Sequence, residues 1–307
     1  LYAAPSWLIK MRCALRFNGS TCDIAVISDD GDFSFQHSLA LPDTYSALLN
    51  SIFDVLKAQD PSGRAKFVGV SLSGDYTSQT ERLYCPSIPL IDGQNLKADL
   101  QAALNREVFI ASHAHMLVKS ASQLPEFKSN TNIFSLYLDD EICAGQFVNQ
   151  ALVTGVNGLA GNWGHICLPW PVEFELEDRD CACGRSGCLC LFVSRAALSR
   201  EYLFLSEREL TAEAIFAQAE QGDIVAESAV QVFEDRLARG LAMAINLIDP
   251  EVILLSGRMS LPKRLLVNLP RKWPGYLRGG AQATKLAVFA NSTEAMREHC
   301  LRGAASL

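Results

Sequence analysis

The spacing of hydrophobic residues in the first part of the chain predicts strands and one helix. Short apolar runs are separated by turn residues, and Asp30-Gly31 between two of them is a common hairpin turn. Residues 45–59 carry apolar side chains three and four positions apart, the period of a helix with one buried face. The predicted strands are residues 13–17, 22–27, 33–35 and 67–72. The predicted order is therefore three strands, a helix and a strand.

The second part of the chain repeats this order. After a glycine- and cysteine-rich segment come two helical patterns, with Gly222 placed to end the first and Asp223 to cap the second. The longer pattern carries a continuous apolar stripe and stops at Asp249-Pro250. The predicted strands are residues 133–138, 142–148, 151–153 and 252–255, and the predicted helices are residues 212–221 and 223–248. Two α/β lobes of similar build follow from this repetition.

The length and charge of the chain narrow its class. At 307 residues it is long enough for two domains. Its net charge of -7 and pI near 5.3 argue against nucleic-acid binding by this chain alone. Its apolar runs fall short of the roughly 18–20 residues of a membrane span, and no export signal is recognisable, so we expect a cytoplasmic protein. Residues 1–10 are expected to be a tail, and the sequence leaves open whether Leu1 is the true start.

A cluster of cysteines gives the strongest chemical signal in the sequence. Clustered cysteines in a long chain without an export signal indicate a metal site rather than disulfides. Three thiolates and one imidazole form the closed tetrahedral set that is typical of structural zinc. The predicted ligands are His165, Cys181, Cys183 and Cys188. The alternative is that some of these are only buried thiols, and Cys190 is a fifth candidate for a site that four ligands already fill.

Several segments together resemble the ROK family (repressors, open reading frames, kinases). The main signature is the run from Gly158 to His165, followed by Leu168-Pro-Trp170 and the cysteine loop. Pro86, the segment 95–100 and the segment 249–253 extend the resemblance over almost the whole chain. It is nearest to the bacterial fructokinase/mannokinase and N-acetylglucosamine kinase branches of that family.

The resemblance implies a fold class and an activity. The fold is α/β, an actin-like (ribonuclease H-like) two-lobed sugar-kinase fold with a zinc-binding loop, and the protein is usually a homodimer. Sugar and ATP bind between the lobes, and an active member phosphorylates a hexose hydroxyl with magnesium-bound ATP. On this basis we expect an N-terminal lobe at residues 1–112 and a C-terminal lobe at residues 113–307. The zinc loop is expected at residues 165–190, and the last helix is expected to return to the N-terminal lobe.

The residues at the family's phosphate-binding positions are altered. Arg16 stands where the first loop has a magnesium-binding Asp, and an arginine could contact phosphate but cannot hold a metal. Gly19 and Ser20 in the same loop are a weak anion signal and are more typical of a hairpin turn. Asp139, Asp140 and Glu141 replace the glycine-rich second loop. Each carboxylate at about 4 Å from a phosphate charge would cost on the order of 4 kcal/mol, although a solvated acidic turn is the simpler interpretation.

The catalytic and sugar-binding positions differ from the family as well. His113, in Ser112-His113-Ala114-His115, occupies the place of the catalytic Asp, and the two histidines could instead form a metal pair or line the cleft without such a role. The positions implied for sugar recognition hold Ser87, Asn162, His165 and Cys190, where two of the family's residues are Glu. The adenosine-side motif at residues 256–260 is partly kept, with Gly257 in place.

Taken together, these substitutions predict a homologue that has kept its scaffold and zinc loop while losing catalytic groups. The first interpretation is a pseudokinase or sugar-sensing protein, with structural zinc as its cofactor and with ATP and magnesium binding in question. A second is an active kinase for fructose, mannose or an N-acetylhexosamine, with His113 as base and Arg16 on phosphate. A third is the effector domain of a ROK transcriptional repressor, which would require a DNA-binding domain before residue 1.

Overall fold

The computed structural model describes residues 11–307 except 29, 78, 178, 258–262 and 281–282. The chain divides into two compact units. The first contains the residues up to Lys128 together with Val153–Ala160 and Arg297–Leu307, and the second contains Ser129–Leu152 and Gly161–Met296. Among the described residues, most strands belong to two five-stranded mixed sheets, one in each unit.

The sheet of the first unit has the strand order β3-β2-β1-β4-β7. Its strands are β1 (Met11–Asn18), β2 (Thr21–Ser28), β3 (Phe33–Ala40), β4 (Phe67–Leu72) and β7 (Glu107–Ser112). β1, β2 and β3 pair antiparallel, whereas β4 and β7 are parallel to β1. Between β4 and β7 in the sequence, β5 (Asp75–Tyr76) and β6 (Leu83–Tyr84) form a small antiparallel hairpin.

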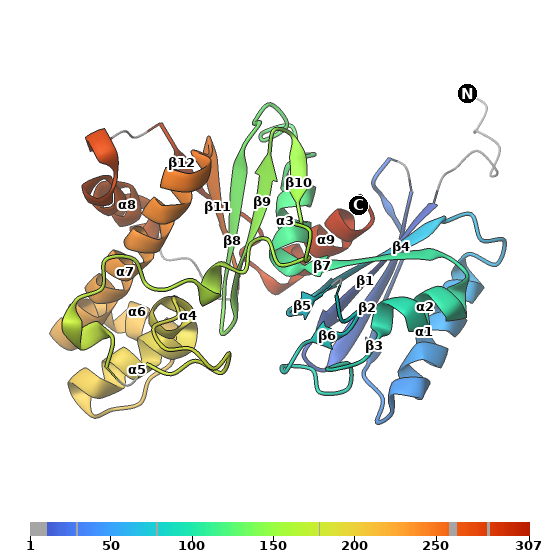
Figure 1. Cartoon of the computed structure of the whole chain (residues 1–307), viewed down its shortest axis with the longest axis horizontal. Coiled ribbons are helices and arrows are strands. Elements are labelled where there is room, and N and C mark those ends of the chain that lie inside the picture. The colour runs from blue at the N-terminus through green and yellow to red at the C-terminus, as the bar shows by residue number, and fades with distance from the viewer. Residues whose placement is uncertain (1–10, 29, 78, 178, 258–262, 281–282) are drawn as a thin grey trace. The chain divides into compact units, whose positions relative to one another are not determined.

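Helices pack on both faces of this sheet (Figure 1). α1 (Tyr45–Gln59) and α2 (Leu96–Leu104) bury their apolar faces against one set of alternate strand residues, such as Leu15 on β1. The intervening strand residues point to the other face, because successive side chains of a strand alternate. The helices on that face are α3 (His113–Ala121) and the second half of α9 (Thr293–Ala304). The end of α9 lies so close to β4 that a Cβ at Gly69 would come within 1.9 Å of the Ala304 carbonyl. By this alternation, Arg16 of β1 and Ser71 of β4 point to the second face.

The second unit repeats the strand order as β10-β9-β8-β11-β12. Its strands are β8 (Ile133–Leu138), β9 (Ile142–Val148), β10 (Ala151–Val153), β11 (Val252–Ser256) and β12 (Lys285–Val288). Its helices are α4 (Cys190–Val193), α5 (Arg195–Ser206), α6 (Ala212–Glu220), α7 (Ile224–Ile248) and α8 (Lys263–Lys272), with 3₁₀ turns η1 (Trp163–His165), η2 (Glu173–Glu175), η3 (Trp273–Tyr276) and η4 (Arg278–Gly280). One core joins β8 and β11 to α7, which contributes Phe233, Leu237 and Leu241.

The strands and helices predicted from hydrophobic spacing are all present, with ends shifted by a few residues. Asp223 caps α7 by accepting a 2.8 Å hydrogen bond from the Ala226 N–H, and the Gly222 before it has φ +91°. The division between units differs from the expected one, since it falls after Lys128 and not after residue 112. The reason is that α3 packs on the first unit, where Gly303 of α9 lies so close to Met116 that a Cβ would come within 2.0 Å of its carbonyl.

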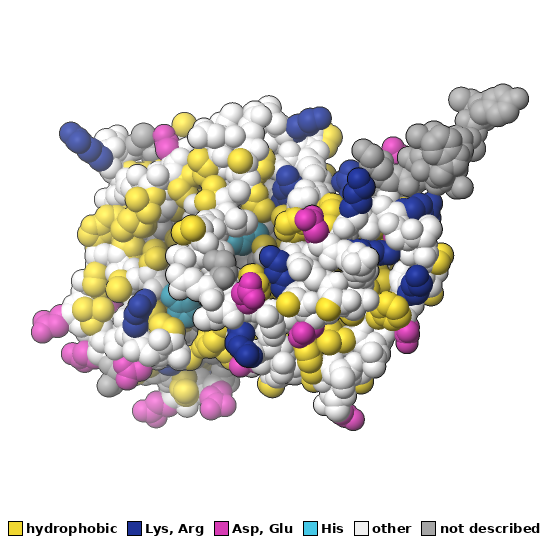
Figure 2. Space-filling view, turned by 45° about the vertical axis from the view of Figure 1, so that its right-hand side comes forward, with side chains coloured by type: hydrophobic (Ala, Val, Ile, Leu, Met, Phe, Trp, Pro, Cys, Tyr) yellow, Lys and Arg dark blue, Asp and Glu magenta, His cyan; other side chains and the backbone are white. Residues whose placement is uncertain are grey.

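The structure also bears on two broader expectations. Among the described residues, no helix is both long and apolar enough to cross a membrane. On the face drawn in Figure 2, Lys and Arg side chains are interspersed with acidic and apolar side chains.

Candidate functional site

The cysteine loop of the second unit is a tight hairpin stitched by backbone hydrogen bonds. Cys181 N–H donates to the Arg185 carbonyl at 2.8 Å, and Gly187 N–H donates to the Arg179 carbonyl at 2.9 Å. Gly184 and Gly187 have φ of +83° and +73°, which a residue with a Cβ adopts only with strain. An antiparallel β-bridge between the backbones of Cys167 and Cys188 then joins the hairpin to the segment after η1. The glycines of the motif therefore let the loop fold back on itself.

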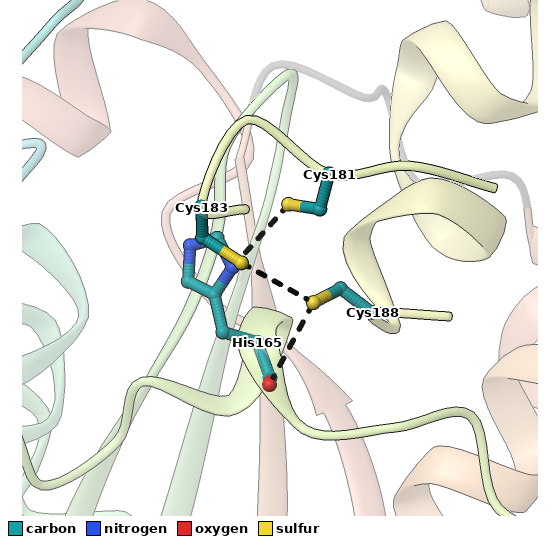
Figure 3. A group of neighbouring side chains, drawn as sticks. All are labelled: His165, Cys181, Cys183 and Cys188. Atoms are coloured by element: carbon teal, nitrogen blue, oxygen red, sulfur yellow. Dashed lines mark hydrogen bonds between the residues drawn. The ribbon is translucent and has the colours of Figure 1, made fainter. Parts of the chain in front are cut away.

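This folding brings four donor atoms together. The ligand atoms of His165, Cys181, Cys183 and Cys188 all lie within 4.8 Å of one another, and Figure 3 shows the three sulfur atoms gathered around the imidazole. The His165 Nδ1 atom is 3.6 Å from the Cys181 sulfur, and the Cys183 and Cys188 sulfurs are 3.6 Å apart. Zinc bonds of about 2.3 Å to sulfur and about 2.0 Å to nitrogen give tetrahedral donor separations of about 3.5–3.8 Å. The donor set and its spacing therefore fit a zinc ion.

Cys190 lies against this group of donors. It is the first residue of α4 and is half-buried, and its sulfur is 3.7 Å from the Cys181 sulfur. Burial, followed by the charge of Cys181, raises the pKa of Cys190 to about 12. Its predicted contact with sugar stays a prediction, and the neighbour that the structure gives it is a ligand thiol.

A buried ion network ties the loop to α7. Glu175 of η2 accepts hydrogen bonds from Arg236 Nε at 2.8 Å and from both terminal nitrogens of Arg239 at 2.7 and 2.9 Å. All three side chains are at least nine-tenths buried. Burial alone would raise the pKa of Glu175, but the hydrogen bonds from Arg239 and Arg236 lower it to about 2. Arg236 also bonds Glu201 of α5 at 2.6 Å, so the network joins the loop to two helices.

Sequence reasoning missed this network, although the sequence holds one sign of it. Arg236 and Arg239 lie within the apolar stripe of α7, on either side of Leu237. An arginine in a buried stripe requires an acidic partner, because an unpaired buried charge is costly. The partner, Glu175, could not be chosen from the sequence, since several acidic residues surround it in the loop.

The residue at the catalytic position is buried in the first unit. Ser112 ends β7 and caps α3, so His113 is the first residue of that helix. His113 is 1% exposed, and its Nδ1 shares a 2.7 Å hydrogen bond with the hydroxyl of Ser71 on β4. His115 is also buried, which lowers its pKa, and its two ring nitrogens lie 2.8 Å from the Ser112 hydroxyl and 3.1 Å from the Val153 carbonyl. These contacts give the imidazoles structural partners and do not support a metal pair.

Arg16 has a buried partner at the place where the family has its magnesium-binding Asp. Its Nη1 atom lies 3.0 Å from a carboxylate oxygen of Asp23, the residue opposite it on β2. The other Asp23 oxygen accepts a 2.8 Å hydrogen bond from Ser38. Both charged side chains are at most 6% exposed. The structure therefore engages Arg16 inside the unit, which argues against the contact with phosphate that the sequence allowed.

These groups form one set of contacts on the second face of the sheet. The buried thiol of Cys300 on α9 contacts both the Ser71 hydroxyl and the Arg16 side chain, and burial raises its pKa. We call Arg16, Asp23, Ser71, His113 and Cys300 the buried polar cluster. It consists of side chains that bond one another within the first unit.

The remaining residues of the first phosphate loop form a turn. Gly19 and Ser20 are exposed and connect the paired residues Asn18 and Thr21 of β1 and β2. Gly19 has φ +57°, which explains the glycine by the turn alone. Their role in nucleotide binding stays a prediction, and the hairpin alternative describes the local structure.

The acidic turn after β8 differs from the expectation of three carboxylates facing phosphate. Asp139 is 2% exposed, and its carboxylate accepts hydrogen bonds from the Tyr137 hydroxyl at 3.1 Å and from the Asp140 N–H at 2.8 Å. Arg195 at the start of α5 lies 3.8 Å from Asp139 and 3.2 Å from Asp140. Glu141 is exposed. The arginine offsets part of the negative charge, so the electrostatic argument against ATP at this turn is weaker than the sequence indicated.

The other predicted site residues have varied surroundings. Ser87 is exposed in the first unit, 3.8 Å from the Cys85 sulfur, and Asn162 is half-buried in the second, just before η1. Gly257 follows β11 with φ +125°, and a Cβ there would come within 1.9 Å of the Leu138 carbonyl. Close packing of the backbone therefore requires this glycine independently of any nucleotide. The rest of the adenosine-side motif, residues 258–260, lies outside the described residues.

Comparison with known proteins identifies the family. The model of the ROK family matches residues 12–307. An N-acetyl-D-glucosamine kinase from Salmonella typhimurium is 26% identical over 274 residues, which cover 87% of this chain and 90% of that protein. Among solved structures, the ROK hexokinase from Thermus thermophilus has a TM-score of 0.83 and 21% identity over 96% of both chains. A ROK family transcriptional regulator described as a homologue of the E. coli MLC protein has a TM-score of 0.78 and 20% identity, covering 96% of this chain and 78% of that one.

The structural neighbours and the two matching sheets agree on one architecture. The strand order in the sheet is equivalent in the two units, and the neighbours are ROK proteins with the actin-like ATPase fold. Because the family model covers nearly the whole described chain, this protein belongs to the ROK family.

Proposed function

We propose that this chain is a sugar-binding ROK protein whose ability to transfer phosphate is impaired. The observation that carries the proposal is the buried polar cluster. The ROK resemblance places a catalytic Asp and a magnesium-binding Asp at the positions of His113 and Arg16. Here both residues are buried and bonded to Ser71 and Asp23, respectively.

The chemistry of these two residues supports impairment. A guanidinium has five donors and no acceptor, so Arg16 cannot ligate magnesium. Breaking a buried ion pair costs about 3–5 kcal/mol, so releasing Arg16 from Asp23 toward a phosphate would be expensive. A general base contributes about 10²–10⁴ in rate, and His113 could act as one only after giving up its bond to Ser71.

A structural zinc ion belongs to this proposal. His165, Cys181, Cys183 and Cys188 would hold it, and four protein donors leave no open position for a substrate, which is the arrangement of structural rather than catalytic zinc. The ion would fix the hairpin, while the Glu175 network fixes the neighbouring part of the loop on α7. Both would keep Asn162 and His165, two predicted sugar contacts, in a set position.

An active kinase is the second candidate. It is favoured by the N-acetyl-D-glucosamine kinases among the relatives and by the arginine that offsets the acidic turn. In that case His113 would be the base, and the substrate would be fructose, mannose or an N-acetylhexosamine. The effector domain of a ROK repressor is favoured only by the similarity of fold to the transcriptional regulator.

Calorimetric titration separates these functions. Zinc-loaded protein is titrated with fructose, mannose, glucose, N-acetylglucosamine and N-acetylmannosamine, first alone and then with magnesium and a non-hydrolysable ATP analogue. We expect a heat signal with at least one sugar and none with the nucleotide. Nucleotide binding that strengthens with a sugar would favour the active kinase, and no signal with any compound would refute sugar binding by this chain.

A further inference from the structure

The metal-binding loop contains one thiol more than the ligand set needs. Cys190 follows the ligand Cys188 by two residues, and its sulfur lies 3.7 Å from the sulfur of Cys181. This separation equals the spacing expected between two donors of one tetrahedral zinc site, about 3.7 Å for two sulfurs. Cys190 is therefore in contact with a predicted ligand thiol, whereas the nearby Cys167 is exposed.

The distance is within the reach of a side-chain rotation. A change between staggered rotamers moves a cysteine sulfur by about 3 Å without any movement of the backbone. If the sulfur of Cys181 were removed, most of the path to its position could be covered in this way. The start of α4, where Cys190 lies, is held by its own hydrogen bonds, such as Phe192 N–H to the Leu189 carbonyl at 3.0 Å.

We propose that Cys190 is a reserve ligand, able to take the place of Cys181 in a zinc site completed by His165, Cys183 and Cys188. The inference rests on the zinc site of the proposed function. It gives Cys190, at the position where the family resemblance implies a sugar-binding Glu, a role toward the metal. The exchange keeps three thiolates and one imidazole, so the charge of the site is unchanged.

The test compares single and double cysteine variants of the whole chain. Zinc content after dialysis and zinc affinity by chelator competition are measured for wild type, Cys181→Ser, Cys190→Ser, Cys181→Ser/Cys190→Ser and Cys183→Ser. We expect wild type and both of the first single variants to keep one zinc per chain, with affinity within about tenfold. The double variant and Cys183→Ser should lose about 100-fold or more, because each then lacks a fourth donor.

Cobalt substitution reports the number of sulfur ligands directly. The sulfur-to-cobalt charge-transfer absorption of Cys181→Ser should equal that of wild type, since Cys190 replaces the lost thiolate. A fall by about one third, as two thiolates instead of three would give, overturns the proposal. Loss of zinc by Cys181→Ser to the level of Cys183→Ser also overturns it. Absence of zinc from wild type would instead refute the metal site itself, and Cys167→Ser is the matched control for removing a nearby thiol.

Discussion

The metal-binding loop and the buried polar cluster satisfy their polar groups in opposite ways. In the loop, four donor atoms converge within 4.8 Å, and three of them are thiols that gain most from a shared cation. In the buried polar cluster, the cation is part of the protein, because Arg16 already neutralises Asp23. One region is arranged to take up a metal ion, and the other contains its own cation.

This difference explains why one ROK feature is kept and another is altered. Folding of the hairpin depends on four metal donors and on its glycines, so losing a donor that no other thiol replaces would disturb the whole loop. The interior of the first unit requires that its buried charges be paired. Arg16 and Asp23 pair with each other, whereas two buried carboxylates without a cation would leave unpaired charges. Stability of this unit therefore does not require the family's catalytic residues.

Removing the metal should have the largest effect. Cys183→Ser, or exhaustive chelation, is expected to lower the melting temperature of the protein by about 10 °C, since binding energy of a structural zinc is folding energy. Melting followed by circular dichroism, with and without added zinc, measures this. A melting temperature that zinc does not change would contradict the structural role. Cys167→Ser serves as the control.

Breaking the buried pair should be the next largest effect. Arg16→Met leaves Asp23 buried without its cation and should lower the free energy of unfolding by about 3–5 kcal/mol. Arg16→Met combined with Asp23→Leu should recover most of this, because no unpaired charge remains. Urea unfolding of Arg16→Met, of Asp23→Leu and of the double variant gives the coupling energy, and additive losses would show that the pair is not coupled. Arg16→Asp, which restores the family's residue, should be less stable than Arg16→Met and remain inactive.

The Glu175 network should show itself in the acid range. The folded-state pKa of Glu175 is about 2 against an ordinary 4.5, so its contribution is complete above pH 4.5 and is lost as the pH falls toward 2. The shift corresponds to about 3 kcal/mol. We predict that Glu175→Gln is less stable than wild type at pH 7 and that the difference shrinks between pH 4.5 and 2. Acid releases zinc from wild type and from Glu175→Gln alike, so zinc release does not contribute to the difference between their stabilities. A stability difference that stays constant between pH 4.5 and 2 would argue against the shifted pKa.

Neutralising the acidic turn should have the smallest effect. Asp140 is exposed and shares Arg195 with Glu213, so Asp140→Asn is expected to change stability by less than about 0.5 kcal/mol. Asp139→Asn, at the buried neighbour, should cost more because its bonds to Tyr137 and to backbone are weakened. Equal effects in urea unfolding would contradict this distinction. Neither variant should gain ATP affinity if the acidic turn is not the main obstacle.

The sequence predicted the repeated elements of the fold because hydrophobic spacing records which faces are buried. The order of β1 to β4 and of β8 to β11, with the long α7, follows from that spacing. The zinc ligands could be proposed because cysteine and glycine spacing is local. The pairing of Arg16 with Asp23 depends on the exact register of the β1–β2 hairpin. The pairings of His113 with Ser71 and of Glu175 with α7 depend on packing between distant segments, which no local pattern encodes. The same holds for Arg195 at the acidic turn.

The most direct test of impairment is a single-turnover assay with excess zinc-loaded protein and γ-labelled ATP, magnesium and each of the five sugars. An active ROK N-acetylglucosamine kinase is the positive control. We predict transfer to sugar at a rate at least about 10⁴-fold below that control, the loss expected when a base and a metal ligand are both missing. Transfer within about 100-fold of the control, abolished by His113→Ala, would contradict impairment and establish His113 as the base of a working kinase.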